Sequence, residues 1–448
     1  MQKRTKAVSA RQAAVEILLQ VLKDGAYTNI AMNKYLRSHE LTDLDRRLLT
    51  ELVYGTIKAL GTVDWYLGQC VNRPLAKIEA PILNILRLGV YQILYMDKIP
   101  VSAACNEAVK LARVYSHEGS AKFVNGVLRG FLRKKDELEF PSEAEDEAGY
   151  LALKLLHPRW LVKKWLTQYG REATIRLCEF NNTPAPVCMR VNTLVADRDA
   201  LIRNLEAAGA EVHASKWSKD GIVCDKMPAL SNVFAELKHD FYIQDESSML
   251  VAEVLAPQPG EKIVDMCSAP GGKTTHIAEK MGDKGEILAG DIHEHKIKLI
   301  EENASRLGIT IIKAQQRDAS VFDEYLAGKA DRVLVDAPCS GLGVLRRRAE
   351  MRWRRTRADI RPLPKLQLQI LENGARYVKD GGIIVYSTCT IEPAENHYVI
   401  AAFMEKHPEW EFAGVKHPLT GETLDELQLL PQVDGIDGFY ICALRKVK

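Results

Sequence analysis

Two cysteines of this chain stand where they could act on one substrate. Cys339 lies in Asp336-Ala-Pro-Cys-Ser340 and Cys389 lies in Ser387-Thr-Cys-Thr390, and each motif follows a short apolar segment typical of a buried strand. In a doubly wound sheet two such strands can be neighbours about 5 Å apart, with their carboxyl ends opening on the ligand crevice. We therefore expect both thiols to face one ligand.

Paired thiols have a specific use in pyrimidine chemistry. Carbon 5 of cytosine is too poor a nucleophile to attack a methyl sulfonium, but a thiolate added at carbon 6 turns the ring into an enamine with a reactive carbon 5. After methyl transfer the carbon-5 proton must leave and the thiolate must be eliminated, which a second thiol could assist. The residues alone leave open which thiol attacks. Six other cysteines are expected to be buried as small apolar residues: Cys70, Cys105, Cys178, Cys188, Cys224 and Cys442.

A glycine-rich turn precedes both cysteine motifs. The sequence Asp265-Met-Cys-Ser-Ala-Pro-Gly-Gly-Lys-Thr274 joins a predicted strand to a predicted helix, where a ligand can approach bare backbone N–H groups. A phosphate-binding P-loop would need glycine where Cys267 stands, and a dinucleotide site would need GxGxxG where only Gly271-Gly272 is present. Both phosphate-binding interpretations are therefore weakened.

Three aspartates after the following strands favour a nucleoside without phosphates. Asp291 ends the second predicted strand, where a carboxylate can accept hydrogen bonds from both ribose hydroxyls; Asp318 follows the third strand and Asp336 ends the fourth. S-adenosyl-L-methionine carries an adenine amine, a sulfonium and an ammonium, all of which suit carboxylates. The alternative for each aspartate is a simple helix N-cap.

The elements that must position these residues fall into three parts. Residues 1–140 have apolar residues at three- and four-residue spacing and predict an all-α bundle. The acidic run 142–147 predicts a linker. Residues 151–240 mix helical and strand patterns and predict a small α+β module, while 241–448 predict an α/β Rossmann-like domain with a parallel sheet. Its predicted strands are 263–266, 286–290, 310–314, 332–335 and 383–386.

The composition is that of an ordinary globular protein. The 448 residues are 46% hydrophobic and 27% charged, which excludes disordered, collagen-like and coiled-coil chains. A net charge of +2 excludes a globally polybasic nucleic-acid binder but not a local basic groove. The nine cysteines show no CxxC or zinc-ribbon spacing, so no metal is expected. No apolar run approaches 18 residues, so no membrane span is expected, and unpaired thiols suit a reducing cytoplasm.

A basic stretch lies between the two cysteine motifs. Eight arginines stand against two acids across residues 346–361. Arginine pairs bidentately with phosphate, and Trp353 could stack on a base, so this stretch is predicted to hold RNA. The alternative is a solvated, charged helix face.

The motifs together resemble a known family. Three motifs occur in the order found in RNA cytosine-C5 methyltransferases. They are the glycine-rich turn at 265–274, Asp336-Ala-Pro-Cys-Ser-Gly341, and Ser387-Thr-Cys-Thr390 with Glu395-Asn396. Other segments carry the resemblance outside these motifs: Asp45-Arg-Arg47, Leu52-Val-Tyr-Gly55 and Phe123-Val-Asn-Gly-Val-Leu-Arg129 are similar to a NusB-type RNA-binding domain, and Met189-Arg-Val-Asn-Thr193 supports an RNA-binding role for 151–240. The combination resembles bacterial enzymes that methylate a cytosine of 16S ribosomal RNA.

This resemblance implies roles that spacing does not assign. In the RNA enzymes the cysteine of the Thr-Cys motif, here Cys389, attacks the base, and the cysteine after Pro, here Cys339, promotes product release; DNA cytosine-C5 methyltransferases use the Pro-Cys thiol instead. His397 departs from the family pattern, where many relatives carry Glu. The implied contacts to S-adenosyl-L-methionine come from Cys267, Ser268, Ala269, Pro270, Gly271, Gly272, Lys273, Asp291, Asp318 and Asp336.

The expected protein is a cytoplasmic monomer of three domains. They are a NusB-like helical domain at 1–140, a small α+β RNA-binding module at 151–240, and an S-adenosylmethionine-dependent methyltransferase domain at 241–448. Its expected reaction is methylation of carbon 5 of one cytosine in 16S ribosomal RNA through a covalent Cys389 adduct. The alternatives are methylation of tRNA or another RNA, and a non-catalytic RNA-binding assembly factor, which would need neither Cys389 nor Cys339.

Overall fold

The computed structural model describes residues 9–226 and 237–447. The chain forms two compact units, of which the first comprises Met1–Thr183 and Leu345–Arg354 and the second comprises Pro184–Val344 and Arg355–Lys448. The chain therefore leaves the first unit after Thr183, returns to it for the short segment Leu345–Arg354, and leaves again. The division into three domains stays a prediction.

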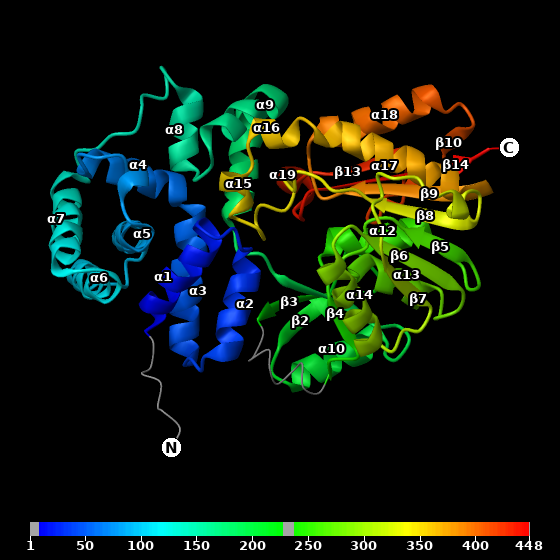
Figure 1. Ribbon diagram of the computed structural model, residues 1–448, viewed down its shortest axis with the longest axis horizontal. Coiled ribbons are helices and arrows are strands. Elements are labelled where there is room, and N and C mark those ends of the chain that lie inside the picture. Colours follow the sequence, from blue (N-terminus) through cyan, green and yellow to red (C-terminus); the bar gives the residue numbers. More distant parts are fainter. Residues whose placement is uncertain (1–8, 227–236, 448) are drawn as a thin grey trace. The chain divides into compact units, whose positions relative to one another are not determined.

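The first unit is helical, as predicted for its first 140 residues (Figure 1). Side-chain caps start four of its described helices; at two of them Ser9 Oγ accepts the N–H of Gln12, and Thr42 Oγ1 accepts the N–H of Asp45. The helices are α1 (Ala10–Leu22), α2 (Thr28–Ser38), α3 (Asp43–Lys58), α4 (Leu60–Cys70), α5 (Ala80–Tyr95), α6 (Val101–Tyr115), α7 (Glu118–Lys134), α8 (Glu147–Lys154) and α9 (Arg159–Asn182), with the 3-10 turn η1 (Leu75–Lys77).

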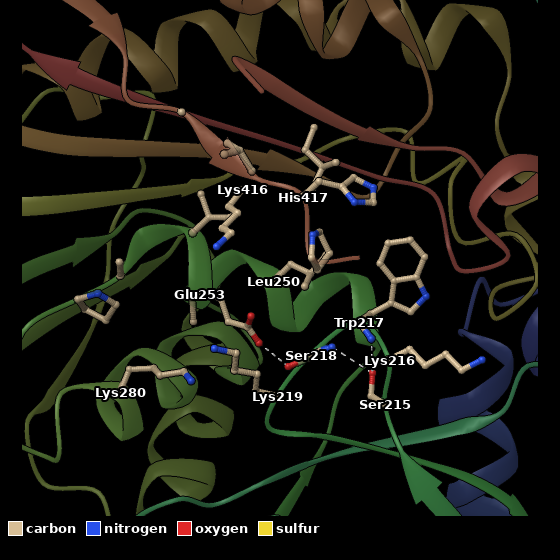
Figure 2. Close-up of a pocket in the computed structure, with 18 of the residues that line it drawn as sticks. Ser215, Lys216, Trp217, Ser218, Lys219, Leu250, Glu253, Lys280, Lys416 and His417 are labelled. Carbon is tan, nitrogen blue, oxygen red and sulfur yellow. Dashed lines mark hydrogen bonds between the residues drawn. The ribbon is translucent and has the colours of Figure 1, made fainter. Parts of the chain in front are cut away.

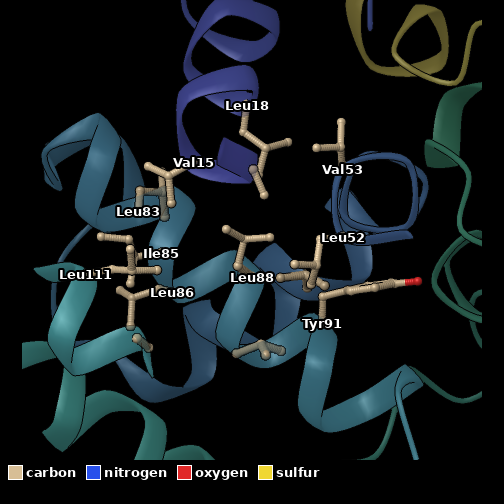
Figure 3. Close-up of a cluster of buried hydrophobic side chains, with 14 of the residues drawn as sticks. Val15, Leu18, Leu52, Val53, Leu83, Ile85, Leu86, Leu88, Tyr91 and Leu111 are labelled. Atoms are coloured by element: carbon tan, nitrogen blue, oxygen red, sulfur yellow. The ribbon is translucent and has the colours of Figure 1, made fainter. Parts of the chain in front are cut away.

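Helix α5 forms the centre of this bundle. It packs against α1, α3, α4, α6 and α7. Its side chains are apolar around most of the helix, and Ile85, Leu86 and Val90 are fully buried. A helix that is apolar on all sides must be surrounded to be stable. Figure 3 shows this core, where Leu18 of α1 and Leu52 of α3 lie near the side chains of α5.

The predicted linker at 142–147 does not separate the two units. Residues 143–145 form a turn, and α8 and α9 continue the first unit beyond it. Helix α9 is broken at Gly170, whose φ of +77° lies in the left-handed region that favours glycine. The returning segment ends in α15 (Met351–Arg354), and Ala349 is buried in the core of the bundle.

The second unit begins with a small antiparallel sheet in the order β2-β3-β1-β4. Its strands are β1 (Val187–Val191), β2 (Glu211–Ala214), β3 (Gly221–Lys226) and β4 (Phe241–Ile243), and helix α10 (Arg198–Ala207) packs on β2 and β3. Alternate apolar residues such as Met189, Ile222 and Phe241 are buried beneath α10 with Leu201. This sheet and helix confirm the expected α+β class.

A larger sheet of eight described strands follows, in the order β10-β14-β9-β8-β5-β6-β7, with β13 paired to β14. Strands β5 to β9 are parallel, and β14, β10 and β13 are antiparallel to their neighbours. The bounds are β5 (Lys262–Asp265), β6 (Glu286–Asp291), β7 (Ile312–Gln316), β8 (Ala330–Asp336), β9 (Val378–Thr388), β10 (Trp410–Phe412), β13 (Glu426–Leu429) and β14 (Phe439–Lys446). Because β6 and β8 flank β5, the strand order reverses there, which is where such sheets bind ligands.

Helices cover both faces of this sheet (Figure 1). Helices α12 (Glu246–Leu255), α13 (Gly272–Lys280) and α14 (Glu294–Arg306) lie on one face, and α17 (Leu363–Tyr377) and α18 (His397–Lys406) lie on the other. The short elements η2 (Glu324–Leu326), α16 (Arg357–Ile360), η3 (Pro393–Glu395), β11 (Val415–Lys416), β12 (Thr423–Leu424) and α19 (Pro431–Asp434) complete the unit. The expected α/β class is confirmed.

The third parallel strand begins two residues later than predicted. The prediction was 310–314, whereas β7 is Ile312–Gln316. The side chain of Asp283 accepts the backbone N–H groups of Thr310 and Ile311 at 3.0 and 3.2 Å, so these two N–H groups are turned away from the neighbouring strands. Within the described ranges, no helix is both long and apolar enough to cross a membrane.

Candidate active site

The thiols of Cys339 and Cys389 meet at the carboxyl edge of the large sheet. Strands β8 and β9 are parallel neighbours, and Asp336 pairs with Ser387 at their ends, so the two cysteine motifs leave the sheet at the same level. The two Sγ atoms lie 3.3 Å apart. The sheet thus brings together two residues that are 50 positions apart in the chain.

A buried carboxylate holds the loop that carries Cys339. Glu395 is fully buried. Its Oε2 accepts the backbone N–H of Ser340 at 2.8 Å and the side-chain amide of Gln367 at 3.0 Å. The same amide donates to the carbonyl of Pro338 at 3.0 Å. The backbone on both sides of Cys339 is therefore fixed by groups that the motif search did not single out as site residues.

The backbone of Cys389 is held in a similar way. Its carbonyl accepts the N–H of Gly343 at 3.1 Å. A Cβ at Gly343 would lie 2.1 Å from the carbonyl oxygen of Gly438, so only glycine allows these two backbone segments to lie this close together. Before the cysteine, Thr388 Oγ1 donates to Asn396 Oδ1 at 2.6 Å. These contacts explain why Glu395-Asn396 accompanies the Thr-Cys motif.

Both ends of the returning segment Leu345–Arg354 are tied to the cysteine motifs. Gly343 precedes this segment and donates to the Cys389 carbonyl. Arg355 follows it and donates to the carbonyls of Ser340 and Cys339 at 3.2 and 3.3 Å. The residues on either side of the segment Leu345–Arg354 are therefore hydrogen-bonded to the backbone that carries the two thiols.

Lys273 places a positive charge beside the thiols. Its Nζ lies 2.8 Å from Asp336 Oδ2, and Ser387 Oγ donates to Asp336 Oδ1 at 2.9 Å. Burial lowers the pKa of Lys273, but the negative charges of Asp336 and Cys389 outweigh burial and raise this pKa above its usual value. Lys273 is therefore cationic at neutral pH and favours a thiolate at Cys389.

The surroundings of Cys339 keep its thiol protonated. Its hydrogen bond with the Cys389 thiol, together with burial, raises the pKa of Cys339 well above its usual value. Cys339 therefore keeps its proton at neutral pH and can act as a hydrogen-bond donor to the neighbouring sulfur. A thiol that keeps its proton is a poor nucleophile.

The glycine-rich turn connects β5 to α13 and is organised by Asp265. This residue is buried, and its Oδ2 accepts from Thr274 Oγ1 at 2.7 Å. Ser268 Oγ donates to the Asp265 carbonyl at 2.9 Å. Burial raises the pKa of Asp265 to about 6. Gly271 has a φ of +102° and a Cβ there would lie 3.3 Å from Ile300 Cα, so this turn needs glycine.

The rest of the turn lies against the end of β6. The N–H of Ser268 donates to the carbonyl of Gly290 at 2.8 Å, and the peptide between Ala269 and Pro270 is cis. Cys267 is partly buried, and burial raises the pKa of its thiol. This thiol therefore stays neutral, as expected of a residue that lines a site without reacting.

The two remaining aspartates differ in their surroundings. Asp291 is 7% exposed, and its Oδ1 accepts the N–H of His293 at 2.9 Å. Asp318 is exposed, and its Oδ1 accepts the N–H and Oγ–H of Ser320 at 2.9 and 2.6 Å. Asp318 also lines a small cavity, of about 30 Å³, together with Gly290. Each aspartate thus accepts the N–H of the residue two positions later, and neither is a helix N-cap, because His293 precedes α14 and Asp323 precedes η2.

Five of the six cysteines expected to be buried are buried in the structure: Cys105, Cys178, Cys188, Cys224 and Cys442. The expectation was wrong for Cys70, which is partly exposed at the last residue of α4. The end of a helix leaves one side of the residue without a neighbouring turn, so a small side chain there remains accessible.

The RNA-binding prediction for the basic stretch 346–361 is wrong for its central residues. Trp353 Nε1 donates to the carbonyl of Ile57 at 2.6 Å, so its ring is packed in the helical unit and does not offer a face to a base. Arg352 is fully buried and donates to the carbonyls of Leu156 and Asn181.

Arg354 and Arg355 have similar structural roles. Arg354 donates to the carbonyl of Val21 in the last turn of α1 at 2.7 Å and to that of Gly25 beyond the helix at 2.9 Å. Arginine forks satisfy carbonyls at helix ends in the same geometry that would suit phosphates. Only Arg348, Arg357 and Arg361 of the eight are exposed, and a phosphate contact by these three stays a prediction.

Arg190 is a second basic residue with a structural role that the sequence did not reveal. It is fully buried in β1, and its guanidinium contacts both carboxylate oxygens of Glu279 in α13 at 2.9 and 2.7 Å. It also donates to the Gly272 carbonyl at 2.6 Å. Arg190 therefore supports the helix that follows the glycine-rich turn and is not available to RNA. The pairing joins residues 89 positions apart, for which one sequence carries no signal.

The groups at the carboxyl edge fit a nucleoside with cationic and hydroxyl donors. Asp265 Oδ1 is buried without a hydrogen-bond partner among the described residues, and a buried carboxylate oxygen of this kind needs a donor. In the described part of the chain no hydrogen bond reaches Asp291 Oδ2, which a ribose hydroxyl could use. A Cβ at Gly272 would lie 3.1 Å from the Tyr242 ring, so a side chain at the start of α13 would require this ring to shift. These residues fit S-adenosylmethionine.

Comparisons with known families cover most of the chain. Residues 8–133 match the NusB family, residues 157–230 match the ferredoxin-like domain of RsmF/B-like methyltransferases, and residues 252–445 match the 16S rRNA methyltransferase RsmB/F family. A crystal structure of the protein PH0851 has a TM-score of 0.87 with this chain at 28% identity, covering 99% of this chain and 100% of that one. A structure of NSun6 from Pyrococcus horikoshii with SFG has a TM-score of 0.57 at 26% identity, covering 65% of this chain and 98% of that one.

Full-length relatives show the same relationship. A probable ribosomal RNA small subunit methyltransferase B of Bacillus subtilis is 41% identical over 98% of this chain and 99% of its own length. The ribosomal RNA small subunit methyltransferase B of Cronobacter sakazakii is 33% identical over 98% of this chain and 99% of its own length. With a helical NusB region, a ferredoxin-like sheet and paired cysteines at the edge of a methyltransferase sheet, the chain belongs to the RsmB/F family of 16S rRNA methyltransferases.

Proposed function

We propose that this protein transfers a methyl group from S-adenosylmethionine to carbon 5 of a cytosine in 16S ribosomal RNA, with Cys389 as the nucleophile. The observation that carries the proposal is the thiol pair, with 3.3 Å between Cys339 Sγ and Cys389 Sγ beside the Lys273 ammonium. A chain that merely bound RNA would need neither thiol. Family membership supports the RNA substrate.

The cofactor would be held by the glycine-rich turn and the acids at the strand ends. S-adenosylmethionine supplies, when bound, an electrophilic methyl group on a positively charged sulfur. Asp291 would accept hydrogen bonds from the ribose hydroxyls, and Asp265 would offer its buried oxygen to a donor of the ligand. Residues 267–273, Asp318 and Asp336 would complete the contacts to the cofactor, with Asp318 at the exposed rim.

Cys389 would act first on the target base. Its thiolate, stabilised by Lys273, adds to carbon 6 of the cytosine, and the new S–C bond makes carbon 5 nucleophilic. Carbon 5 then takes the methyl group. The base must leave its stack to reach the sulfur, which costs least in a loop.

Cys339 would act at product release. After methyl transfer a water molecule from solvent takes the proton from carbon 5. The electron pair of that C–H bond restores the double bond of the ring as the bond between carbon 6 and Cys389 breaks, which leaves a thiolate on Cys389. Cys339 retains its proton and lies 3.3 Å from the departing sulfur, so that it can donate a hydrogen bond to the thiolate. The same contact disfavours Cys339 as the attacking group.

The test uses single substitutions and a methyl-transfer assay on unmodified 16S ribosomal RNA. Cys389→Ala should abolish methyl transfer, and Cys339→Ala should accumulate a covalent RNA–protein adduct that runs as a slow band on a denaturing gel. Cys70→Ala, which changes a partly exposed thiol in α4, is the control and should retain activity. Full activity of Cys389→Ala would refute its role, and a Cys339→Ala enzyme that slows without forming an adduct would remove release from the role of Cys339.

We further propose that the protein acts as a monomer in the cytoplasm. The turn for the cofactor and both thiols come from one unit of one chain, so no partner is needed to complete the site. All nine cysteines lie in the described ranges and none forms a disulfide, as is usual in a reducing compartment.

A further inference from the structure

A pocket of about 640 Å³ opens in the second unit, away from the thiols (Figure 2). Its walls are the turn 215–219 between β2 and β3, helix α12 with residues 256–258, Lys280, and the segment 414–418. Residues 256–258 lead into β5, and α13 runs back from the carboxyl edge to end at Lys280. The pocket therefore lies at the amino-terminal edge of the parallel strands, whereas the thiols lie at the carboxyl edge.

The pocket is strongly cationic in a chain whose net charge is only +2. Glu253 is the one acid among its lining residues. Glu253 accepts from Ser218 Oγ at 2.6 Å, and burial raises its pKa. The basic side chains that line the pocket are Arg198, Lys216, Lys219, Lys280 and Lys416. This excess of positive charge in a concave site favours an anionic ligand.

Three of these cations are available to a ligand. Lys280 is already paired, because its Nζ lies 2.5 Å from Asp220 Oδ2, and Arg198 Nε lies 3.7 Å from Asp199 Oδ1. Lys216, Lys219 and Lys416 are exposed, and within the described residues their ammonium groups form no hydrogen bond or ion pair. Figure 2 shows that they come from two walls, with Lys416 on the strand above α12 and the other two on the turn below it.

Both walls that carry these lysines are held in place by their own side chains. Ser215 Oγ accepts the N–H groups of Trp217 and Ser218 at 3.0 and 3.1 Å and donates to Glu246 at 2.6 Å. On the opposite wall His417 Nδ1 accepts the N–H groups of the two residues at 419 and 420 at 3.3 and 3.1 Å. The lysines therefore extend from ordered turns, which limits the entropy lost on binding.

The pocket also offers flat and donor surfaces beside the cations. Trp217 is 8% exposed and packs edge-on against His417, with 5.9 Å between the ring centres. Because Nδ1 of His417 accepts two hydrogen bonds, its proton lies on Nε2, which can donate to a ligand. A ligand that combines an anionic group with a planar ring, such as a nucleotide, would use all of these features.

We propose that this pocket is a second RNA-contact site, which takes a phosphate-bearing nucleotide of the substrate RNA at a distance from the target cytosine. The inference rests on the proposed function, because that function makes a long RNA the natural polyanion for this surface. Strand β8 has 7 residues, so the two edges of the sheet are about 23 Å apart at ~3.3 Å per residue. A long RNA that lies along the second unit would reach both sites.

The test compares binding of unmodified 16S ribosomal RNA by the full chain and by the variant Lys216→Ala/Lys219→Ala/Lys416→Ala over a salt series from about 50 to 200 mM. Each lost phosphate contact lowers the slope of log affinity against log salt by about 0.7 to 1. We expect a slope smaller by about 2 and a dissociation constant raised by about tenfold. At saturating RNA the methylation rate should be unchanged, because the pocket lies away from the thiols, while KM should rise.

A matched control removes the same charge elsewhere in the second unit. The variant Lys284→Ala/Lys298→Ala/Lys365→Ala changes three exposed lysines that do not line the pocket. It should retain the wild-type salt slope. Thermal unfolding of both triple variants should match the wild type, since all six side chains are exposed. A loss of RNA binding in the pocket variant alone would then show that the pocket lysines contact RNA.

Three outcomes would overturn the inference. One is an unchanged salt slope and KM in the pocket variant. The second is that the pocket variant no longer binds adenosine monophosphate but still binds RNA as the wild type does, which would make the pocket a site for free nucleotides. The third is that the pocket variant no longer binds a poly-glutamate peptide but still binds RNA as the wild type does, which would indicate an acidic protein partner. A wild-type chain that binds RNA through the pocket but transfers no methyl group would instead refute the proposed function alone.

Discussion

The Sγ atoms of Cys339 and Cys389 lie 3.3 Å apart at the ends of adjacent parallel strands, and their loops are tied together by Glu395 and Gly343. A disulfide needs about 2.05 Å between sulfurs, so a small movement would join them. The arrangement that lets one thiol assist the other therefore also makes the pair sensitive to oxidation.

Mild peroxide should inactivate the enzyme reversibly through this pair. The two thiols give up two electrons and two protons to hydrogen peroxide, which yields the disulfide and two water molecules. Methyl transfer should fall in step with the appearance of a linked peptide in mass spectrometry, and dithiothreitol should restore it. Cys70→Ala should respond like the wild type. Inactivation without the linked peptide would contradict the prediction.

Glu395 is expected to act as a positioning residue for Cys339. Glu395→Ala removes the acceptor for the Ser340 N–H and the Gln367 amide, so the loop should lose its fixed place and adduct release should slow by about 10- to 100-fold. Glu395→Gln keeps one carbonyl oxygen and should rescue part of the rate. The measurement is the decay of the covalent adduct, which a purely structural role would leave unchanged.

The control for this prediction is Glu405→Ala, which alters an exposed carboxylate of α18. Its adduct should decay at the wild-type rate. If Glu395→Ala lowers the melting temperature but leaves adduct decay unaltered, then Glu395 stabilises the fold without positioning the thiol.

Gly61 should be essential for docking the returning segment. A Cβ at Gly61 would lie 2.5 Å from the Trp353 ring, so Gly61→Ala must displace Trp353 and should destabilise the first unit by about 1 to 3 kcal/mol. Gly68 lies in the same helix, α4, and no atom lies within 4 Å of the position of its added Cβ. Gly68→Ala should therefore stabilise by up to about 1 kcal/mol through helix propensity. Equal melting temperatures for the two variants would contradict this account.

Stability should depend on pH through Asp265. Burial raises its pKa to about 6 in the folded chain, compared with about 3.9 unfolded, so the folded state binds a proton more tightly. The wild type should therefore gain stability as pH falls through about 6. Asp265→Asn keeps an acceptor for Thr274 but cannot ionise, and should be more stable than the wild type at pH 8 by up to about 3 kcal/mol.

This advantage should shrink as pH falls below about 6, because the wild-type side chain is then protonated and uncharged. The measurement is the difference in melting temperature between the variant and the wild type at pH 5 and pH 8. Asp97→Asn, at an exposed carboxylate, should show no such difference. A constant advantage of Asp265→Asn across this range would contradict the assignment of the shift to ionisation.

The amino-acid sequence by itself determined the elements that carry the chemistry. Apolar periodicity and the Asp336-Ala-Pro-Cys and Ser387-Thr-Cys motifs located the strand ends, and β8 and β9 are neighbours as expected. Local patterns suffice here because a parallel sheet directs the carboxyl ends of its strands to one edge whatever the rest of the chain does.

Only the tertiary structure decided what the arginines do. Arg352 and Arg190 have the residue type that would bind phosphate, yet both are buried on partners 171 and 89 positions away. The charge and length of arginine suit a carbonyl, a carboxylate or a phosphate equally well, so the choice depends on which acceptor the fold brings near. The same holds for Glu395 and for the lysines of the second pocket, whose surroundings arise from segments that are distant in the chain.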